Sequence, residues 1–326
     1  MHIGNPLRAA LEATRAMTRL LEKGRRFRHR LTAHLGRDIE SLLLVTGRQM
    51  ARSTPATVDT IERAEFRVFS QWGEDGIIQY LVDHVPIQRR VFVEFGVGDY
   101  QESNTRFLLQ NNYWRGLVMD ADNSHIDFLT GSGLLWRHSI DARSAFITRE
   151  NINGLLEEAG ISGDVGLLSV DVDGNDFWVL QGLTSISPRI LIVEYNALFG
   201  DQAAITIPYD PQFVRAKAHY SNVYYGASLA AMNHLAVSRG YQLVGCESAG
   251  VNAFFVRSDV AGSLPNLSPS AAYRPRQHRE ARGERGDLTY LSGWQAELNL
   301  ILDLPAVEVR SLNTGRIGDF VSAEPE

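Results

Sequence analysis

The stretch Arg90-Val-Phe-Val-Glu-Phe-Gly-Val-Gly-Asp99 decides the fold of this chain. Its first half is rich in β-branched and aromatic residues, which predicts a buried strand, and that strand runs directly into Gly96-Val-Gly98. Paired glycines at this point let the backbone pass close to a ligand. Nucleotide-binding α/β folds use the arrangement at the carboxyl edge of their first strand, so we expect a ligand site there.

Composition indicates an ordinary globular protein of 326 residues, with 44% hydrophobic and 21% charged residues. Its single cysteine, Cys246, excludes a disulfide framework and any multi-cysteine metal site. No stretch approaches the roughly 18 to 20 apolar residues that span a bilayer. We therefore expect a soluble, cytoplasmic protein without a transmembrane segment.

The basic charge is concentrated at the N-terminus. Residues 1–52 carry 11 Lys or Arg and 4 Asp or Glu, so the remainder is clearly acidic. Apolar residues at helical spacing predict one or two amphipathic helices up to about residue 50. Such helices can bind a membrane surface or a polyanion, but we favour packing of their basic face against the body of the protein or against a second subunit. In the second case the protein would be a homo-oligomer. We predict an extension and linker over 1–57, a catalytic domain over 58–260, and a loop and helix extension packing on it over 261–326.

From residue 58 onward, helix and strand signals alternate. A helix over 70–82 precedes the first strand, and another is expected over 147–159. Further strands are predicted over 115–120, 134–141, 165–171 and 189–194. This alternation predicts an α/β fold with a parallel sheet and helices on both faces.

An acidic residue stands at or near the end of each of these five predicted strands. Parallel strands point the same way, so these residues are expected along one edge of the sheet, where cofactors bind. The five are Glu94, Asp120, Asp141, Asp171 and Glu194.

The glycine turn favours S-adenosylmethionine over a dinucleotide. A dinucleotide fingerprint has a third glycine, where this chain has Gln101. Glu94 and Asp99 flank the turn with negative charge, which disfavours pyrophosphate and suits a cofactor with ammonium and sulfonium groups. Asp120 follows the glycines by about 20 residues, the spacing of an acid that binds ribose hydroxyls.

Residues from about 70 to 259 resemble class I S-adenosylmethionine-dependent methyltransferases, and within them the FkbM-like and sugar O-methyltransferase families. The matching segments are Glu94-Phe-Gly-Val-Gly98, Glu102-Ser-Asn-Thr105, Trp114-Arg-Gly-Leu117 ending at Asp120, Asp171-Val-Asp-Gly-Asn-Asp176, Glu194-Tyr-Asn196 and Tyr225-Gly-Ala-Ser-Leu229. The resemblance implies a Rossmann-like sheet of seven strands, mostly parallel, whose last two strands we place at 241–246 and 252–257 as an antiparallel hairpin.

The resemblance also implies the cofactor contacts. Glu94, Gly96 and Gly98 would approach the methionine part, Asp120 the ribose and Asp141 the adenine amino group. Ser103, Asn104 and Thr105 would add hydrogen bonds, and Gln71 would close the pocket.

The run Asp171-Val-Asp-Gly-Asn-Asp176 is unusual. Its glycine is misplaced for an EF-hand loop, and Gly182 stands where that loop has its last ligand. We instead expect Asp171, Glu194 and Asn196 to bind Mg²⁺ or another divalent cation, which several O-methyltransferases use at similar positions. The alternatives are that Asp171 binds substrate and that Asp176 caps the next helix.

The predicted activity is methyl transfer to a hydroxyl of a sugar or glycosylated small molecule. Asp171 orients the acceptor, Asp173 is the first choice of general base and His219 the second, whereas His138 is considered structural. A non-catalytic interaction module is the alternative, and an NAD-dependent oxidoreductase is disfavoured. We expect no nucleic-acid partner. The arginine-rich segment 273–285 is expected to be a solvated loop, with a flap or a contact for an anionic acceptor as the alternatives.

Overall fold

The computed structural model describes residue 36 and residues 38–321, so the predicted helical signals before residue 36 lie outside the described part of the chain. The chain divides into two compact units, residues 1–49 and residues 50–326. Residues 38–53 are helical, as predicted. In the described residues, no helix is long and apolar enough to cross a membrane.

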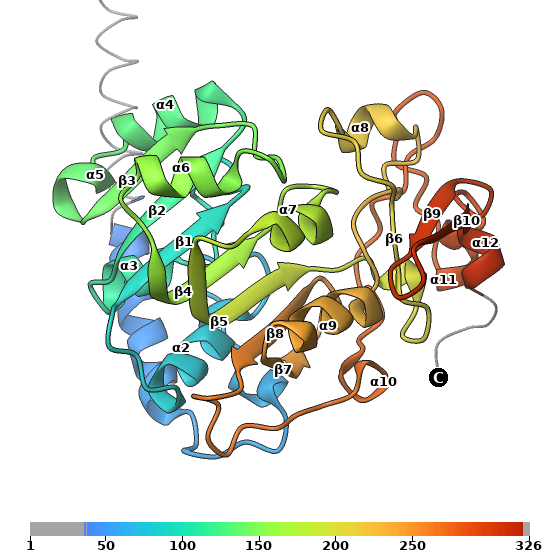
Figure 1. Ribbon diagram of the computed structural model, residues 1–326. Coiled ribbons are helices and arrows are strands. Elements are labelled where there is room, and N and C mark those ends of the chain that lie inside the picture. The colour runs from blue at the N-terminus through green and yellow to red at the C-terminus, as the bar shows by residue number, and fades with distance from the viewer. Residues whose placement is uncertain (1–35, 37, 322–326) are drawn as a thin grey trace, which may run out of the picture. The chain divides into compact units, whose positions relative to one another are not determined.

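The second unit alternates strands and helices along most of its length (Figure 1). Its elements are η1 (Ile61–Ala64), α2 (Glu74–His84), β1 (Val91–Phe95), α3 (Arg106–Asn111), β2 (Arg115–Asp120), α4 (Asn123–Gly131), α5 (Leu134–Arg137), β3 (Ile140–Ser144), α6 (Ile152–Glu158), β4 (Gly163–Val170), α7 (Asp176–Gly182), β5 (Ile186–Glu194), η2 (Ala197–Phe199), β6 (Ile205–Thr206), α8 (Arg215–Ala218), α9 (Leu229–Ser238), β7 (Tyr241–Cys246), β8 (Asn252–Arg257), α10 (Pro269–Ala272), α11 (Trp294–Leu298), β9 (Pro305–Glu308), β10 (Asn313–Arg316) and α12 (Ile317–Phe320).

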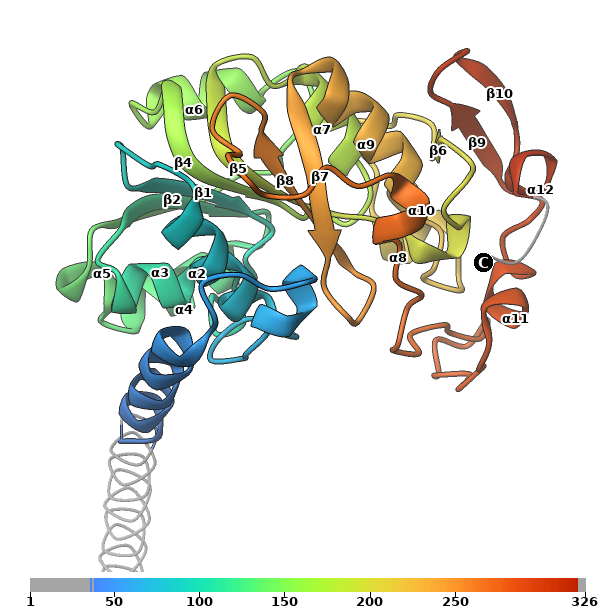
Figure 2. The same cartoon turned by 90° about the horizontal axis from the view of Figure 1, so that it is seen from below.

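The main sheet has seven strands in the order β3-β2-β1-β4-β5-β8-β7. The pairs among β1 to β5 are parallel, and β8 runs antiparallel to both β5 and β7. Helices α2 to α5 cover one face, while α6, α7 and α9 cover the other (Figure 2). This confirms the predicted Rossmann-like sheet with an antiparallel last hairpin.

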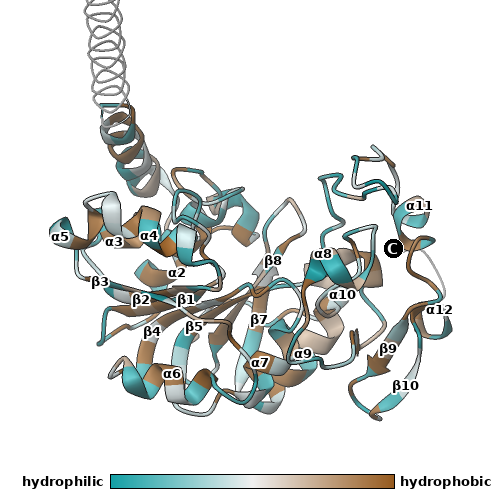
Figure 3. Cartoon of the chain, turned by 90° about the horizontal axis from the view of Figure 1, so that it is seen from above, coloured by the Kyte–Doolittle hydropathy of each residue, from teal (hydrophilic) through white to brown (hydrophobic). Residues whose placement is uncertain are grey.

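Side chains alternate between the two faces along each strand, and helices cover both faces, so the central strands contribute to a core on each side of the sheet. Val91, Val93 and Phe95 of β1 join the core beneath α6, α7 and α9. Phe92 joins the core on the α2 and α3 side. The central strands are accordingly mostly hydrophobic in the layer between the helices (Figure 3), whereas the residues of the edge strand β3 are half-buried or exposed.

The predicted strand over residues 134–141 is wrong. Leu134–Arg137 forms the short helix α5, and β3 begins only at Ile140. Leu134 and Leu135 pack on the core while Trp136 is 77% exposed, so the apolar run covers the sheet as one helical turn. The shift places Asp141 second in β3 rather than last.

Residues 261–326 belong to the same compact unit as the main sheet. They contribute β9 and β10 to a small sheet of order β10-β9-β6, which the sequence did not indicate. The helix predicted within this extension is represented by α11, which ends at Leu298. A separate core that includes Ile205, Ile301 and Ile317 holds this region together.

Candidate functional site

Four of the five predicted acids reach the carboxyl edge of the sheet. The strand register pairs Phe95 with both Met119 and Val170, and Val170 with Val193. Glu94, Asp120, Asp171 and Glu194, next to these residues in sequence, therefore stand at nearly the same level on four neighbouring strands.

Asp141 is the exception. It pairs in register with Leu117, well before the end of β2, and it forms an ion pair with Arg143 at 2.7 Å. It lines a cavity together with Arg89, which precedes β1, and Arg115, the first residue of β2. This cavity therefore lies at the amino edge of the sheet. The predicted contact between Asp141 and adenine is thus incompatible with its position.

The glycine turn is fixed by a close approach to β4. Gly96 has φ +72°, and a Cβ atom there would lie 1.6 Å from the carbonyl oxygen of Asp171. Only glycine fits both the backbone conformation and this contact. The Gly96 N–H donates to the Met119 carbonyl at 2.9 Å, so the turn joins the ends of three strands.

Glu94 is buried and organises the loop before α3. Its carboxylate accepts hydrogen bonds from the Ser103 hydroxyl at 2.7 Å, the Asn104 N–H at 2.8 Å, and the N–H and hydroxyl of Thr105 at 3.1 and 2.5 Å. Burial raises the pKa of Glu94, and these bonds act in the opposite direction. Ser103, Asn104 and Thr105 thus each donate to Glu94, and the Asn104 side chain also donates to Ser169 Oγ at 3.1 Å.

Asp120 closes the turn from the other side. One carboxylate oxygen accepts from the Gly98 N–H at 2.8 Å. The other accepts from the Asp122 N–H at 2.8 Å and lies 3.1 Å from His125 Nδ1. This contact raises the pKa of His125. A carboxylate has about four acceptor positions, so Asp120 keeps capacity for a further donor such as a ribose hydroxyl.

A cavity of about 560 Å³ lies along this edge. Its volume is within the range of about 300–1,000 Å³ that is usual for small-molecule and cofactor sites. It is lined by Gln71, Glu74, Glu94, Phe95, Gly96, Val97, Gly98, Asp99, Gln101, Glu102, Ser103, Asn104, His125, Asp171 and Asn252.

A smaller cavity of about 130 Å³ is formed where β2, β3 and β4 end. It shares Gly96 and Asp171 with the larger cavity, so the two adjoin at the glycine turn. Its lining combines apolar and polar side chains: Met119, Ala121, Ala145, Phe146, Ile147, Val172 and Phe213, together with Asp120, Asp171, Asp173 and Asn175.

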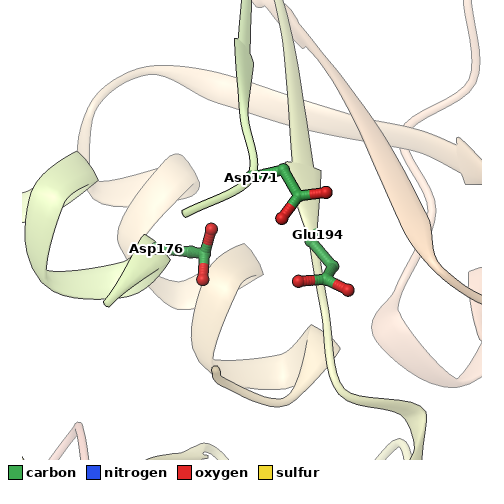
Figure 4. Close-up of side chains that lie close together, drawn as sticks. All are labelled: Asp171, Asp176 and Glu194. Carbon is green, nitrogen blue, oxygen red and sulfur yellow. The ribbon is translucent and has the colours of Figure 1, made fainter. Parts of the chain in front are cut away.

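Three carboxylates converge at the ends of β4 and β5 (Figure 4). An oxygen atom from each of Asp171, Asp176 and Glu194 lies within 4.8 Å of the other two. Asp176 accepts from the N–H groups of Val172 at 2.7 Å and Gly174 at 2.9 Å, which fixes it at the start of α7. Glu194 Oε2 is buried and has no hydrogen-bond partner among the described residues. We call these three residues the carboxylate cluster.

Burial and mutual repulsion raise the pKa values of the carboxyl groups in the cluster. Burial raises the pKa of Asp171 and Glu194 well above their ordinary values, and repulsion among the carboxylates adds to this. Burial likewise raises the pKa of Asp176 to about 6. The guanidinium of Arg215 acts in the opposite direction on Asp171 and Glu194. A divalent cation would relieve the same repulsion, and oxygen donors are its preferred ligands.

The Asn196 amide makes its hydrogen bonds to the chain after β5. Its Nδ2 donates to the carbonyls of Val223 and Tyr225, each at 3.0 Å, and its Oδ1 accepts from the Leu198 N–H at 3.0 Å. Asp176, rather than Asn196, is the third member of the group of carboxylates at Asp171 and Glu194. The run Asp171-Val-Asp-Gly-Asn-Asp176 contains this third carboxylate, for which the sequence predicts only the role of a helix cap.

The predicted bases lie outside the cluster. Asp173 has φ +55° and a side chain that is 70% exposed, and it pairs with Arg215 at 3.1 Å. His219 Nδ1 lies 2.7 Å from Ser221 Oγ, and burial lowers the pKa of the imidazole. His138 lines the cavity at the amino edge, just before β3.

Arg215 is the functional candidate that the sequence did not reveal. Its guanidinium lies 3.6 Å above the ring of Tyr225, and it pairs with Glu280 at 2.5 Å as well as with Asp173. Only the fold brings together residues that are 42 and 65 positions away from it.

The arginine-rich segment is not a plain solvated loop. Arg276 is almost fully buried and pairs with Glu280 and Glu297. Arg274 pairs with Glu62. These ion pairs attach the segment to the body of the protein.

No family model and no curated protein matches this sequence. Methyltransferases are among the similar solved structures. An S-adenosylmethionine-dependent methyltransferase from Clostridium acetobutylicum is 9% identical over 56% of this chain and 89% of that chain, with a TM-score of 0.35. An O-methyltransferase from Bacillus cereus, solved with S-adenosylhomocysteine, is 13% identical over 67% and 89%, with a TM-score of 0.34. TrmK from M. capricolum, solved with the same product, is 10% identical with a TM-score of 0.30 over 51% of this chain, and the match spans only 60% of TrmK. Likeness at this level assigns no activity to the chain.

Proposed function

We propose that this protein is an S-adenosylmethionine-dependent O-methyltransferase. One observation carries the proposal: the larger cavity at the glycine turn and the smaller cavity beside Asp120 both reach Asp171 of the carboxylate cluster. A methyl donor and an oxygen acceptor need two such compartments side by side, because methyl transfer requires both reactants in line.

The larger cavity suits the methionine and ribose parts of the cofactor. Its acidic lining favours a ligand that carries ammonium and sulfonium groups and no phosphate. Gln71 lines the larger cavity, whereas Asp120 lines the adjoining smaller one and is our candidate acceptor for a ribose hydroxyl. The bound cofactor supplies an activated methyl group on sulfur. Since Asp141 lies at the other edge, the smaller cavity between Ala145 and Val172 replaces it as the adenine pocket.

The carboxylate cluster is the proposed acceptor side. Asp171, Asp176 and Glu194 fit a hard divalent cation such as Mg²⁺, since they offer only oxygen donors and Glu194 Oε2 is unpartnered among the described residues. A cation at this position would polarise the acceptor hydroxyl. In the transfer, the bond between sulfur and the methyl carbon would break as the bond to the acceptor oxygen forms. Asp173 and His219 remain our candidates for the base that would take the hydroxyl proton.

The proposed acceptor is a hydroxyl of a sugar or a glycosylated small molecule. The resemblance to sugar O-methyltransferases supports this choice of acceptor. We further propose a cytoplasmic location and a homo-oligomer formed through the N-terminal helices.

Calorimetric titration tests the function first. Protein freed of carried-over ligand should bind S-adenosylmethionine and S-adenosylhomocysteine with micromolar affinity. Incubation with methyl-labelled S-adenosylmethionine and a set of monosaccharides and glycosides should then give labelled product, and EDTA should stop the transfer. Transfer at full rate in EDTA would remove the cation from the mechanism.

The alternative is a methyltransferase-like module that has no catalytic activity. It predicts no heat with either cofactor form. The same titration therefore decides between the two functions before any acceptor is known.

A further inference from the structure

The segment from Tyr209 to Arg215 is fastened to the loop between β4 and α7. The Asn175 side chain donates to the Asp210 carbonyl at 2.8 Å. Five residues later, Arg215 pairs with Asp173 at 3.1 Å. These contacts join a segment that follows β6 to the loop that carries Asp173 and Asn175.

Phe213 lies between these two attachments and packs directly on Gly174. That glycine has φ +147°, and a Cβ atom at this position would come within 2.2 Å of the Phe213 ring. The ring is half-buried and lines the smaller cavity together with Phe146 and Val172. Gly174 thus provides the space that the aromatic ring occupies beside the cavity.

We propose that Phe213 forms a wall of the adenine pocket, so that residues 209–215 close the methyl-donor site from the acceptor side. The inference rests on the function proposed above and adds a residue and a segment that do not belong to the sheet edge. A small cavity with two aromatic side chains and several aliphatic ones suits a flat heteroaromatic ring, which gains from ring contacts beyond the burial of apolar area.

The same segment links donor and acceptor sides. Arg215 follows Phe213 by two residues, and its guanidinium contacts Asp173 and Glu280. Its charge also acts on Asp171 and Glu194 of the carboxylate cluster. An adenine ring that packs on Phe213 would therefore also hold the Arg215 guanidinium near the carboxylate cluster.

Calorimetry with S-adenosylhomocysteine and adenosine tests the inference. We expect Phe213→Ala to weaken both by about tenfold, since a lost aromatic contact and the lost apolar area together correspond to about that ratio. Phe213→Leu should weaken both by a smaller factor, about threefold, because it keeps apolar volume without the ring. Homocysteine, which lacks adenine, serves as the negative probe. Tyr220→Ala is the matched control, because Tyr220 is 43% exposed and its ring contacts His219 at a tilt, outside the cavity.

Hydrogen exchange on the wild-type protein gives a second measurement that needs no substitution. S-adenosylhomocysteine should slow exchange at amides within residues 210–215, and homocysteine should not. Unchanged exchange there, or binding by Phe213→Leu and Phe213→Ala within twofold of the wild type, would overturn the inference while leaving the proposed function intact. Absence of S-adenosylhomocysteine binding to the wild type would instead overturn the proposed function.

Discussion

The two halves of the carboxyl edge use carboxylates in opposite ways. On the donor side, the protein itself satisfies Glu94 and Asp120, through four hydrogen bonds from residues 103–105 and through the N–H groups of Gly98 and Asp122. On the acceptor side, Asp171 and Glu194 face Asp176 and each other, and Glu194 Oε2 has no hydrogen-bond partner among the described residues.

The difference indicates what each set does. Carboxylates bonded to backbone N–H groups shape loops, and those on the donor side hold the glycine turn and the loop before α3 in place. Carboxylates that are buried against one another are destabilising unless a proton or a cation joins them. The acceptor side therefore keeps carboxylate oxygens free for a ligand, whereas on the donor side Glu94 is used for the protein's own structure and Asp120 only in part.

The largest expected effect is on the acceptor side. Asp171→Ala and Glu194→Gln should each weaken Mn²⁺ binding by at least about 100-fold, since even groups that only support metal ligands contribute about 10–100-fold. Methyl transfer should be lost with the cation. Mn²⁺ titration followed by electron paramagnetic resonance measures the affinity. Asp173→Asn is the matched control, as it removes a neighbouring exposed carboxylate from outside the cluster and should leave Mn²⁺ affinity within about threefold.

On the donor side, the main effect should be on stability. Glu94→Ala leaves buried donors of Ser103, Asn104 and Thr105 without their acceptor, which should lower the free energy of unfolding by about 2 kcal/mol. Chemical denaturation measures this change. Asp99→Ala, which removes an acceptor of Gln101 only, should change stability by less than about 0.5 kcal/mol. Equal losses in the two variants would contradict the structural role of Glu94.

The pH dependence should distinguish the cluster from ordinary surface acids. Because the folded-state pKa of Asp176 is raised from 3.8 to about 6, the folded protein holds a proton that the unfolded chain releases in this window. The protonated Asp176 carboxyl therefore contributes its full free energy of unfolding below pH 3.8, the ordinary pKa. This contribution falls as the pH rises through the folded-state pKa of about 6. Mg²⁺ replaces the proton, so it should raise the melting temperature by about 3 °C more at pH 8 than at pH 5. Glu194→Gln should abolish this pH difference, and its persistence in that variant would place the cation elsewhere.

The smallest effect is expected at Asp141, which lies near the amino end of β3. Asp141→Asn should leave the affinity for S-adenosylhomocysteine unchanged within about twofold, whereas Asp120→Asn should weaken it by about tenfold through the lost acceptor. Titration calorimetry compares the two. A marked loss in Asp141→Asn would restore the original assignment of this residue to adenine.

The sequence predicted the parts of the site that local patterns determine. Gly96, Asp120, Asp171 and Glu194 sit at the ends of strands whose apolar runs are plain, and parallel pairing then brings them to one edge. The sequence places Asp141 at the end of a strand because the short apolar run at Leu134 and Leu135 is compatible with a strand as well as with one turn of a helix.

The remaining parts depend on contacts that no local pattern encodes. Asn196 follows β5 as a metal ligand would, but its amide is used by backbone 27 and 29 residues away. The sequence predicts Asp176 at the start of a helix. Its approach to Glu194 depends on the crossover that brings β5 beside β4, which the local pattern does not reveal. Arg215 and Phe213 reach the site only because the chain after β6 returns to the loop before α7.

The most direct test is a crystal structure of the protein with S-adenosylhomocysteine and Mn²⁺, in which the metal is located by its anomalous signal. We predict the ribose beside Asp120, the adenine between Phe146 and Phe213, and a manganese peak among Asp171, Asp176 and Glu194. A product molecule bound away from the glycine turn, or a manganese peak outside the carboxylate cluster, would contradict the division of this edge into a donor side and an acceptor side.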